Sequence, residues 1–255
     1  MALGWPVYGL GVMAMAAVCL AWGAFDPGQP VPKAFPDRTA LAYVAAMFVL
    51  VAGAAVECRR MAAWGAGALA AYYALVVVIL LNGRVVLANP TTYVAYSGAA
   101  EQLAIAAGGL IVFAAGARID EPLAARLTLA GRLVFGVCAL IFGGAHFVYL
   151  NFTIPFVPSW LPPSPAFWAY VTGIAHIAAG VALLTGVQAR LAAILLTVMY
   201  ASFTPLVHIP RLLADPSSFE NWTENALNLA LAGVAWVVAD SLAPPRRQPE
   251  PAHSA

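Results

Sequence analysis

The sequence predicts an all-α integral membrane protein, a bundle of about eight transmembrane helices with no soluble domain of any size. Of its 255 residues, 63% are hydrophobic and 9% are charged, whereas a soluble domain carries roughly 25% charged residues to face water. The apolar residues also gather in runs of spanning length, about 17–25 residues for a helix. A formal net charge of +1 gives no basic field to attract nucleic acid. We therefore expect the lipid bilayer, and no nucleic acid, as a partner.

Eight apolar runs are long enough to cross a bilayer. A cleaved signal peptide needs a basic residue before its apolar run. The first run has none, so we keep it as a spanning helix. The second and seventh runs are short, and we expect them to be tilted or partly re-entrant. The eight runs lie at 5–24, 39–56, 61–81, 97–117, 132–150, 165–185, 191–207 and 225–242.

An even number of spans places both termini on one side of the membrane, and the basic residues indicate which side. Eight of the twelve fall on the side of the termini, namely Arg59, Arg60, Arg118, Arg126, Arg132, Arg190, Arg246 and Arg247. Because cytoplasmic loops carry the Lys/Arg excess, we expect both termini to be cytoplasmic. The proline-rich tail at 244–255 is expected to be disordered there.

The first four and the last four spans resemble two copies of one unit. The pattern VPxxxP at Val31 recurs at Val157, 126 residues later, and an arginine with two apolar residues recurs at Arg84 and Arg211, 127 residues apart. Four spans return the chain to its starting side, so the copies form a parallel repeat about an axis along the membrane normal. We expect an N-terminal four-helix repeat at 1–120 and a C-terminal one at 127–243.

The two copies differ in their polar residues within the spans. The C-terminal copy carries His146, His176 and His208 in or beside its spans, and the N-terminal copy has no histidine. Ionisable groups inside a bilayer usually face the bundle interior or a cavity. We therefore expect the first copy to be mainly scaffold and any site to lie in the second copy, toward the outer face.

The candidate ligand or proton-relay residues form a polar group on the outer side that reaches down to His176. Each also has a structural reading, because polar residues at the interface anchor helices and deeper ones hydrogen-bond neighbouring helices. The candidates are His146, His176, His208, Arg211, Glu224, Asn228 and Glu101.

No metal site is expected. The histidine spacings form no local motif such as HExxH, and Cys19, Cys58 and Cys138 form no CxxC pair. Two facing histidines within the membrane would suit axial haem ligation, but only the folded packing could bring them together. Haem is therefore the less favoured cofactor.

The C-terminal copy resembles the DoxX-like family of bacterial membrane proteins. The resemblance rests on GGAHF, VPSWLPPSPAFWAYVTGIAHIAAGVALLTGVQARLAAILLTVMY, VHIP and NLALAGVAWVVAD, within residues 132–240. Many members have one four-helix unit, whereas this chain has two. The resemblance implies a multi-pass protein of the bacterial inner membrane, linked to thiosulfate–quinone and quinol oxidation or to quinone and thiol stress. It brings no catalytic residue set.

Three functions follow from these observations. The favoured one is a redox-associated membrane subunit that binds quinone and works with a membrane or periplasmic redox partner, its histidines bonding the quinone oxygens or relaying protons. The second is a binding or transport protein for a small apolar molecule or lipid. The third is a structural partner of another membrane enzyme. Whether the chain is itself an enzyme stays open.

Overall fold

A computed structural model describes residues 3–244, so all but the first residue of the expected disordered tail lies outside the described residues. The described chain is helical and contains no strand. The elements are α1 (Gly4–Trp22), α2 (Arg38–Glu57), α3 (Ala62–Ala71), η1 (Tyr72–Asn82), α4 (Gly83–Ala88), α5 (Tyr93–Gly116), α6 (Glu121–Val148), α7 (Leu150–Thr153), η2 (Ile154–Phe156), α8 (Pro165–Thr185), α9 (Ala189–Phe203), η3 (Thr204–His208), α10 (Ile209–Ala214) and α11 (Phe219–Ser241).

The main helices begin and end at residues suited to those positions. Asp120 caps α6 by accepting from the Leu123 N–H at 3.1 Å, and Ser164 caps α8 ahead of Pro165. Such side-chain oxygens satisfy amide groups that have no partner within the helix. At the other end, Gly186 takes a left-handed conformation (φ 81°) and ends α8, because glycine adopts this region without steric cost.

Within residues 3–244, seven helical segments are long and apolar enough to cross a membrane. They include two composite helices, 62–88 and 189–214, each of which contains a π-helical stretch. The expectation that the seventh run is short is therefore wrong, because the helix continues for 26 residues past Pro205 and Pro210. The prolines lack amide hydrogens, and the wider π turn re-forms the bonding around them.

The eighth expected span corresponds to α11, which is 23 residues long but is not among the seven apolar segments. Its sequence carries Glu220, Glu224, Asn225, Asn228 and Asp240, and these polar residues lower its mean hydropathy. Much of α11 is nevertheless buried by other helices. A helix shielded from lipid by its neighbours tolerates polar residues that a lipid-facing helix does not.

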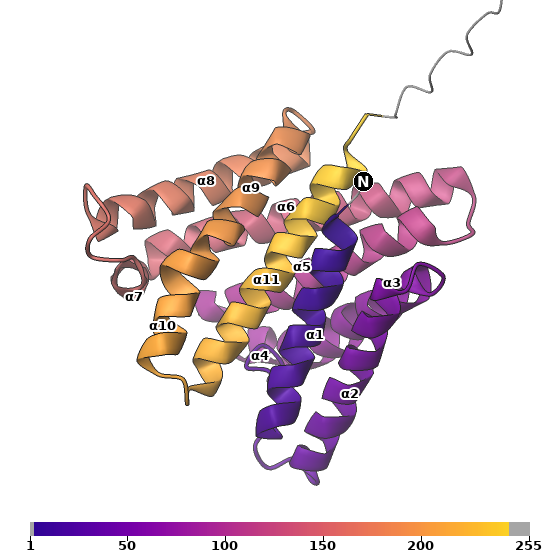
Figure 1. Cartoon of the computed structure of the whole chain (residues 1–255), viewed down its shortest axis with the longest axis horizontal. Coiled ribbons are helices and arrows are strands. Elements are labelled where there is room, and N and C mark those ends of the chain that lie inside the picture. Colours follow the sequence, from indigo (N-terminus) through magenta and orange to yellow (C-terminus); the bar gives the residue numbers. More distant parts are fainter. Residues whose placement is uncertain (1–2, 245–255) are drawn as a thin grey trace, which may run out of the picture.

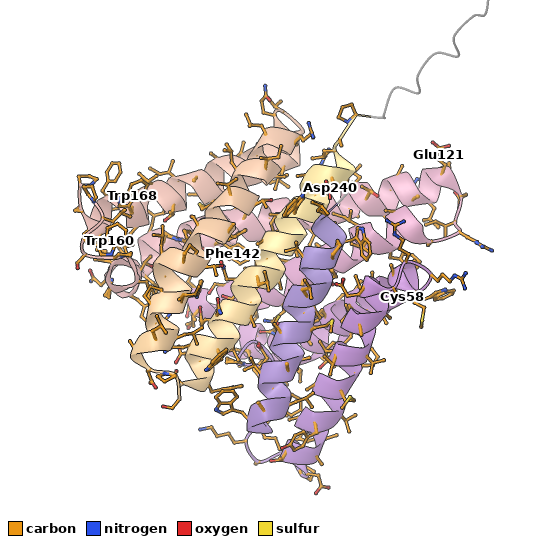
Figure 2. The ribbon with its side chains drawn as sticks, in the orientation of Figure 1. Cys58, Glu121, Phe142, Trp160, Trp168 and Asp240 are labelled. Carbon is orange, nitrogen blue, oxygen red and sulfur yellow. The ribbon has the colours of Figure 1, made fainter. Side chains whose placement is uncertain are left out.

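The main helices pack side by side in a closed ring, and two of them also touch across it. Each main helix contacts the next in the order α1, α2, α3, α5, α6, α8, α9, α11, and α11 returns to contact α1 (Figure 1). A further contact between α5 and α11 crosses the ring and leaves a lobe on each side. The two ends of the described chain meet, because the Gly4 N–H donates to Asp240 Oδ2 at 2.9 Å, and Figure 2 shows Asp240 beside the start of α1. We call this side of the bundle the terminal end and the opposite side the distal end.

The contact between α1 and α11 depends on glycines that let the two backbones touch. A Cβ atom on Gly11 would overlap the backbone of Ala230, and one on Gly233 would overlap the backbone of Tyr8. Small residues at helix contacts are the usual way in which membrane helices approach closely. Because α1 and α11 come from opposite ends of the chain, this contact closes the ring.

We predict that Gly233→Ala lowers the free energy of unfolding by about 1–3 kcal/mol, since the added methyl group has no space. Gly98→Ala is the matched control, because a Cβ on Gly98, which also lies in a helix, meets nothing within 4 Å. Alanine in an open helical position stabilises by about 0.4–1 kcal/mol. Denaturant titration of both variants in detergent micelles measures the difference, and equal stability of the two would contradict the packing.

Candidate functional site

Two histidines of the second half form a ring pair inside the bundle. The imidazoles of His146 on α6 and His176 on α8 lie with centroids 5.1 Å apart and planes tilted by 39°. The buried Phe142 ring packs against His176 in an edge-to-face arrangement. Glycines permit this approach, because a Cβ on Gly173 would crowd the Cβ of His146 at 2.9 Å. The sequence prediction that these two histidines belong to one polar group is consistent with this geometry.

Hydrogen bonds fix which nitrogen of each ring carries the proton. His176 Nδ1 lies 2.8 Å from the Thr172 carbonyl oxygen, and His146 Nδ1 lies 2.8 Å from that of Phe142. A carbonyl oxygen only accepts, so each Nδ1 carries hydrogen and each Nε2 of a neutral ring is an acceptor. His176 Nε2 is 3.2 Å from the Tyr200 hydroxyl, which therefore donates to it.

The two rings differ in what remains unbonded. His176 is 2% exposed, and both its nitrogens have protein partners. His146 is half-buried; its Nε2 is not enclosed, and within residues 3–244 it has no hydrogen-bond partner. His176 is thus held in place by the protein, whereas His146 offers one free acceptor.

Tyr200 is positioned by α11. Asn228 donates through Nδ2 to the Tyr200 carbonyl oxygen at 2.9 Å and to Thr204 Oγ1 at 3.0 Å. Asn228 is buried, and it binds at the junction where α9 becomes π-helical. Its amide therefore fixes the backbone from which the Tyr200 hydroxyl reaches His176. Tyr200 and Thr204 were not among the predicted residues, because a tyrosine and a threonine inside an apolar run give no periodic signal.

His208, Arg211 and Glu224 form a second group, at the distal end of the second half. His208 is 9% exposed, and its Nδ1 is buried with no hydrogen-bond partner among the described residues. The Cζ atom of the Arg211 guanidinium lies 4.2 Å from the centroid of the Phe156 ring. The guanidinium is also close enough to Glu224 for electrostatic interaction with its carboxyl group. Asn228 lies between this group and the ring pair, because its side chain is close to that of His208 and also binds the Tyr200 carbonyl oxygen, while the Tyr200 hydroxyl bonds His176.

Glu101 lies on α5, at the contact between the two lobes. Its carboxyl group lies near those of Asp26 and Glu224 and near Tyr200. Glu101 is thus the predicted residue that lies between the two halves, although it belongs to the first by sequence.

The first half also has a polar interior, which sequence reasoning missed. Four of its polar residues are buried, namely Asp26, Gln29, Asn82 and Gln102. The available signals were the isolated Asn82 at the end of an apolar run and the turn sequence Asp26-Pro-Gly28. Neither signal involves a histidine, so the expectation of a site in the second half did not include them. The interior of the first half therefore contains buried polar side chains as well as apolar packing.

Asp26 lies in the loop between α1 and α2, outside the spanning segments. Burial raises the pKa of its carboxyl group to about 6, the Gly28 N–H that donates to it lowers the pKa, and the nearby Glu224 carboxylate raises it. Within the described residues, no group of three or more His, Cys, Asp or Glu side chains is arranged to hold a metal ion.

Comparison with known proteins agrees with the features of the second half. The DoxX family model matches residues 127–209, which include α8, α9, η3 and nearly all of α6. Residues 127–209, within the C-terminal half, are thus DoxX-like. The matched DoxX-like segment contains His146, His176, Tyr200 and His208, and it ends before α11. No curated protein and no solved structure matches the chain significantly.

We predict that Asn228→Ala lowers the free energy of unfolding by about 1–2 kcal/mol, the upper range for hydrogen bonds between helices in membranes. Asn225→Ala, one turn earlier and half-buried, is the control, and its change should stay within about 0.5 kcal/mol. Unfolding of both variants in mixed micelles gives the two values. Equal losses would show that the amide of Asn228 does not hold the α9 junction.

Proposed function

We propose that this protein is a multi-pass protein of the bacterial inner membrane with eight spans and both termini in the cytoplasm. The meeting of Gly4 with Asp240 supports termini on one side, as an even number of spans requires. The excess of arginine in the loops at that end supports a cytoplasmic location. The distal end, with both histidine-bearing parts, then faces the periplasm.

We also propose that the two halves are copies of one four-helix unit. Helix starts recur after 126 or 127 residues, and so does the π-helical stretch, which ends at Asn82 in one half and at His208 in the other. In this register Tyr73 corresponds to Tyr200 and Gln102 to Asn228, so buried polar positions recur as well. The paired starts are Arg38 with Pro165, Gly83 with Ile209, and Tyr93 with Phe219.

For the second half we propose binding of a quinol-type molecule in a redox-associated role. The observation that carries the proposal is the free Nε2 of His146 beside a ring pair whose other polar atoms are bonded. An unprotonated Nε2 accepts a hydrogen bond, so it suits the hydroxyl group of a quinol better than the carbonyl group of a quinone. The aromatic surface of Phe147 and Tyr170, whose centroids are 5.9 Å apart, offers a place for an apolar ring nearby.

The chemistry that this arrangement supports is removal of a proton from a bound quinol. On oxidation a quinol loses two electrons and two protons. One proton would pass to His146 Nε2, the second would leave to water at the distal face, and the electrons would pass to a separate redox partner. An imidazole suits the first transfer because its unperturbed pKa is about 6.5. His176 would keep the His146 ring in place.

The test is extraction and mass spectrometry of quinones from gently purified protein. We expect wild-type protein to retain quinone, and His146→Ala to retain about tenfold less, the effect of losing about 1.4 kcal/mol of binding. Thr197→Ala is the control, since that hydroxyl bonds only its own helix at Ala193. Equal quinone in wild type and His146→Ala, with unchanged folding, would sink the proposal.

A second candidate function is the binding of a lipid, in particular an anionic one, or of a small apolar molecule. It is favoured by an open apolar groove of about 280 Å³ between α8 and α9, lined by alanines, leucines and Met199. Arg132 lies beside Gly186 in the turn that ends this groove, and its Nε is buried without a partner among the described residues. If the same extraction instead yields an anionic lipid that Arg132→Gln releases and Arg126→Gln retains, this second reading replaces the first.

A further inference from the structure

The loop between α1 and α2 enters the distal end of the first half and is held there by buried amides. Asn82 donates through Nδ2 to the Gly28 carbonyl oxygen at 2.9 Å and to that of Val77 at 2.9 Å. The Tyr72 hydroxyl donates to Gln29 Oε1 at 3.1 Å. These bonds fix a loop that carries an ionisable side chain, Asp26, into the interior.

Asp26 faces a small cavity. Its side chain is 4% exposed, and Oδ1 accepts from the Gly28 N–H at 2.8 Å. The cavity beside it measures about 10 Å³ and is lined by Asp26, Gln29, Cys19 and Tyr73 among apolar residues. This is about the volume that one water molecule needs, and a buried water requires two to four polar partners, which these side chains supply.

A second observation, independent of Asp26, also calls for a polar ligand at this place. Gln102 on α5 is completely buried, and neither Nε2 nor Oε1 has a hydrogen-bond partner among the described residues. Its amide presses against Gly28, on the same face that Asp26 Oδ1 approaches, since a Cβ on Gly28 would meet both. An unpaired buried amide is costly. This amide lies beside the Asp26 carboxyl group across Gly28, next to the cavity and not among the residues that line it.

The charged surroundings determine which species it takes. Two arginines bind the outer part of the loop, Arg38 at the Val31 carbonyl oxygen and Arg84 at that of Pro30, and neither forms an ion pair with Asp26 among the described residues. The carboxyl groups nearby repel a negative charge there. Five titratable groups lie close enough to Asp26 for electrostatic interaction with its carboxyl group, namely Cys19, Tyr72, Tyr73, Glu101 and Glu224.

We propose that Asp26 and Gln102 form a proton-binding site of the first half, in which a proton and one water molecule occupy the space beside the carboxyl group. Binding is a simple transfer: a hydronium ion gives its proton to the Asp26 carboxylate and stays as the water. The cavity is too small for an organic ligand. The site is distinct from the His146–His176 pair and does not depend on whether that pair binds quinol.

The test follows the carboxyl C=O infrared band of purified protein as the pH is raised. We expect a band of a buried carboxylic acid that disappears with a midpoint near pH 6, the pKa to which burial raises Asp26. The band should be lost in Asp26→Asn. It should persist in Asp37→Asn, the matched control, because Asp37 lies exposed in the same loop. A titration with a midpoint near pH 6 that is unchanged in Asp26→Asn, or no titration above pH 5, would overturn the proposal.

A second variant tests the part played by the amide. Gln102→Leu keeps the volume but removes the polar group, so the midpoint should move to higher pH because the carboxylate loses a solvating neighbour. An unchanged midpoint would exclude Gln102 from the site. Exchange of Na⁺ for K⁺ at constant ionic strength should leave the midpoint unchanged. A shift with Na⁺ would identify a metal cation, and not a proton, as the ligand.

Thermal stability gives an independent reading with a defined sign. The pKa of Asp26 is raised in the folded protein, from 3.8 to about 6, so the folded state binds more protons than the unfolded state between these values. Stability should therefore fall as the pH rises from about 4 to about 6 and stay level above that. Asp26→Asn should remove this fall, and Asp37→Asn should keep it.

Discussion

A polar atom inside a membrane bundle must find a partner, because the surrounding lipid offers none, and this constraint accounts for most of the structure. The Nδ1 atoms of both ring-pair histidines donate to carbonyl oxygens of their own helices, the Tyr200 hydroxyl donates to His176, and Asn228 binds the backbone below Tyr200. An unpaired polar group in hydrocarbon costs several kcal/mol, so such chains of bonds hold the helices in one arrangement.

The same constraint separates structural polar residues from candidate ligand groups. His176 and Asn228 have partners and hold the fold. His146 Nε2 and the Gln102 amide lack partners among the described residues, and each lies where a small species can reach it or fit beside it. The two proposals for this protein, a quinol at His146 and a proton with water at Asp26 and Gln102, both rest on this difference.

The sequence predicts the fold class and most of the helices, because the scarcity of charge and the lengths of the apolar runs reflect the solvent directly. It does not predict that the helix that begins with α9 continues past Pro205, through η3 and α10, to Ala214. The π-helical turn that permits this is a tertiary adjustment. It also does not predict the polar interior of the first half. Asn82 and Gln102 are single polar residues among apolar ones, and only the packing shows that they are buried around one loop.

Under the proposed repeat, the two lobes would share their helix arrangement and differ in the residues that line them. Cys19 and Val49 stand in the first half where His146 and His176 stand in the second, at an offset of 127 residues, and all except His146 are buried. The first half instead brings a carboxyl group inward on its loop. Each lobe can therefore serve a different ligand, with Glu101 on the helix between them.

The hydrogen-bonded state of the ring pair is the point on which the account of the second half depends. Nitrogen-15 NMR of the histidine rings in labelled protein measures it directly. We expect hydrogen on Nδ1 of both His146 and His176, with the Nε2 signal of His176 shifting in Tyr200→Phe and that of His146 staying nearly unchanged. Hydrogen on Nε2 of either ring, or a His176 signal indifferent to the loss of the Tyr200 hydroxyl, would contradict it.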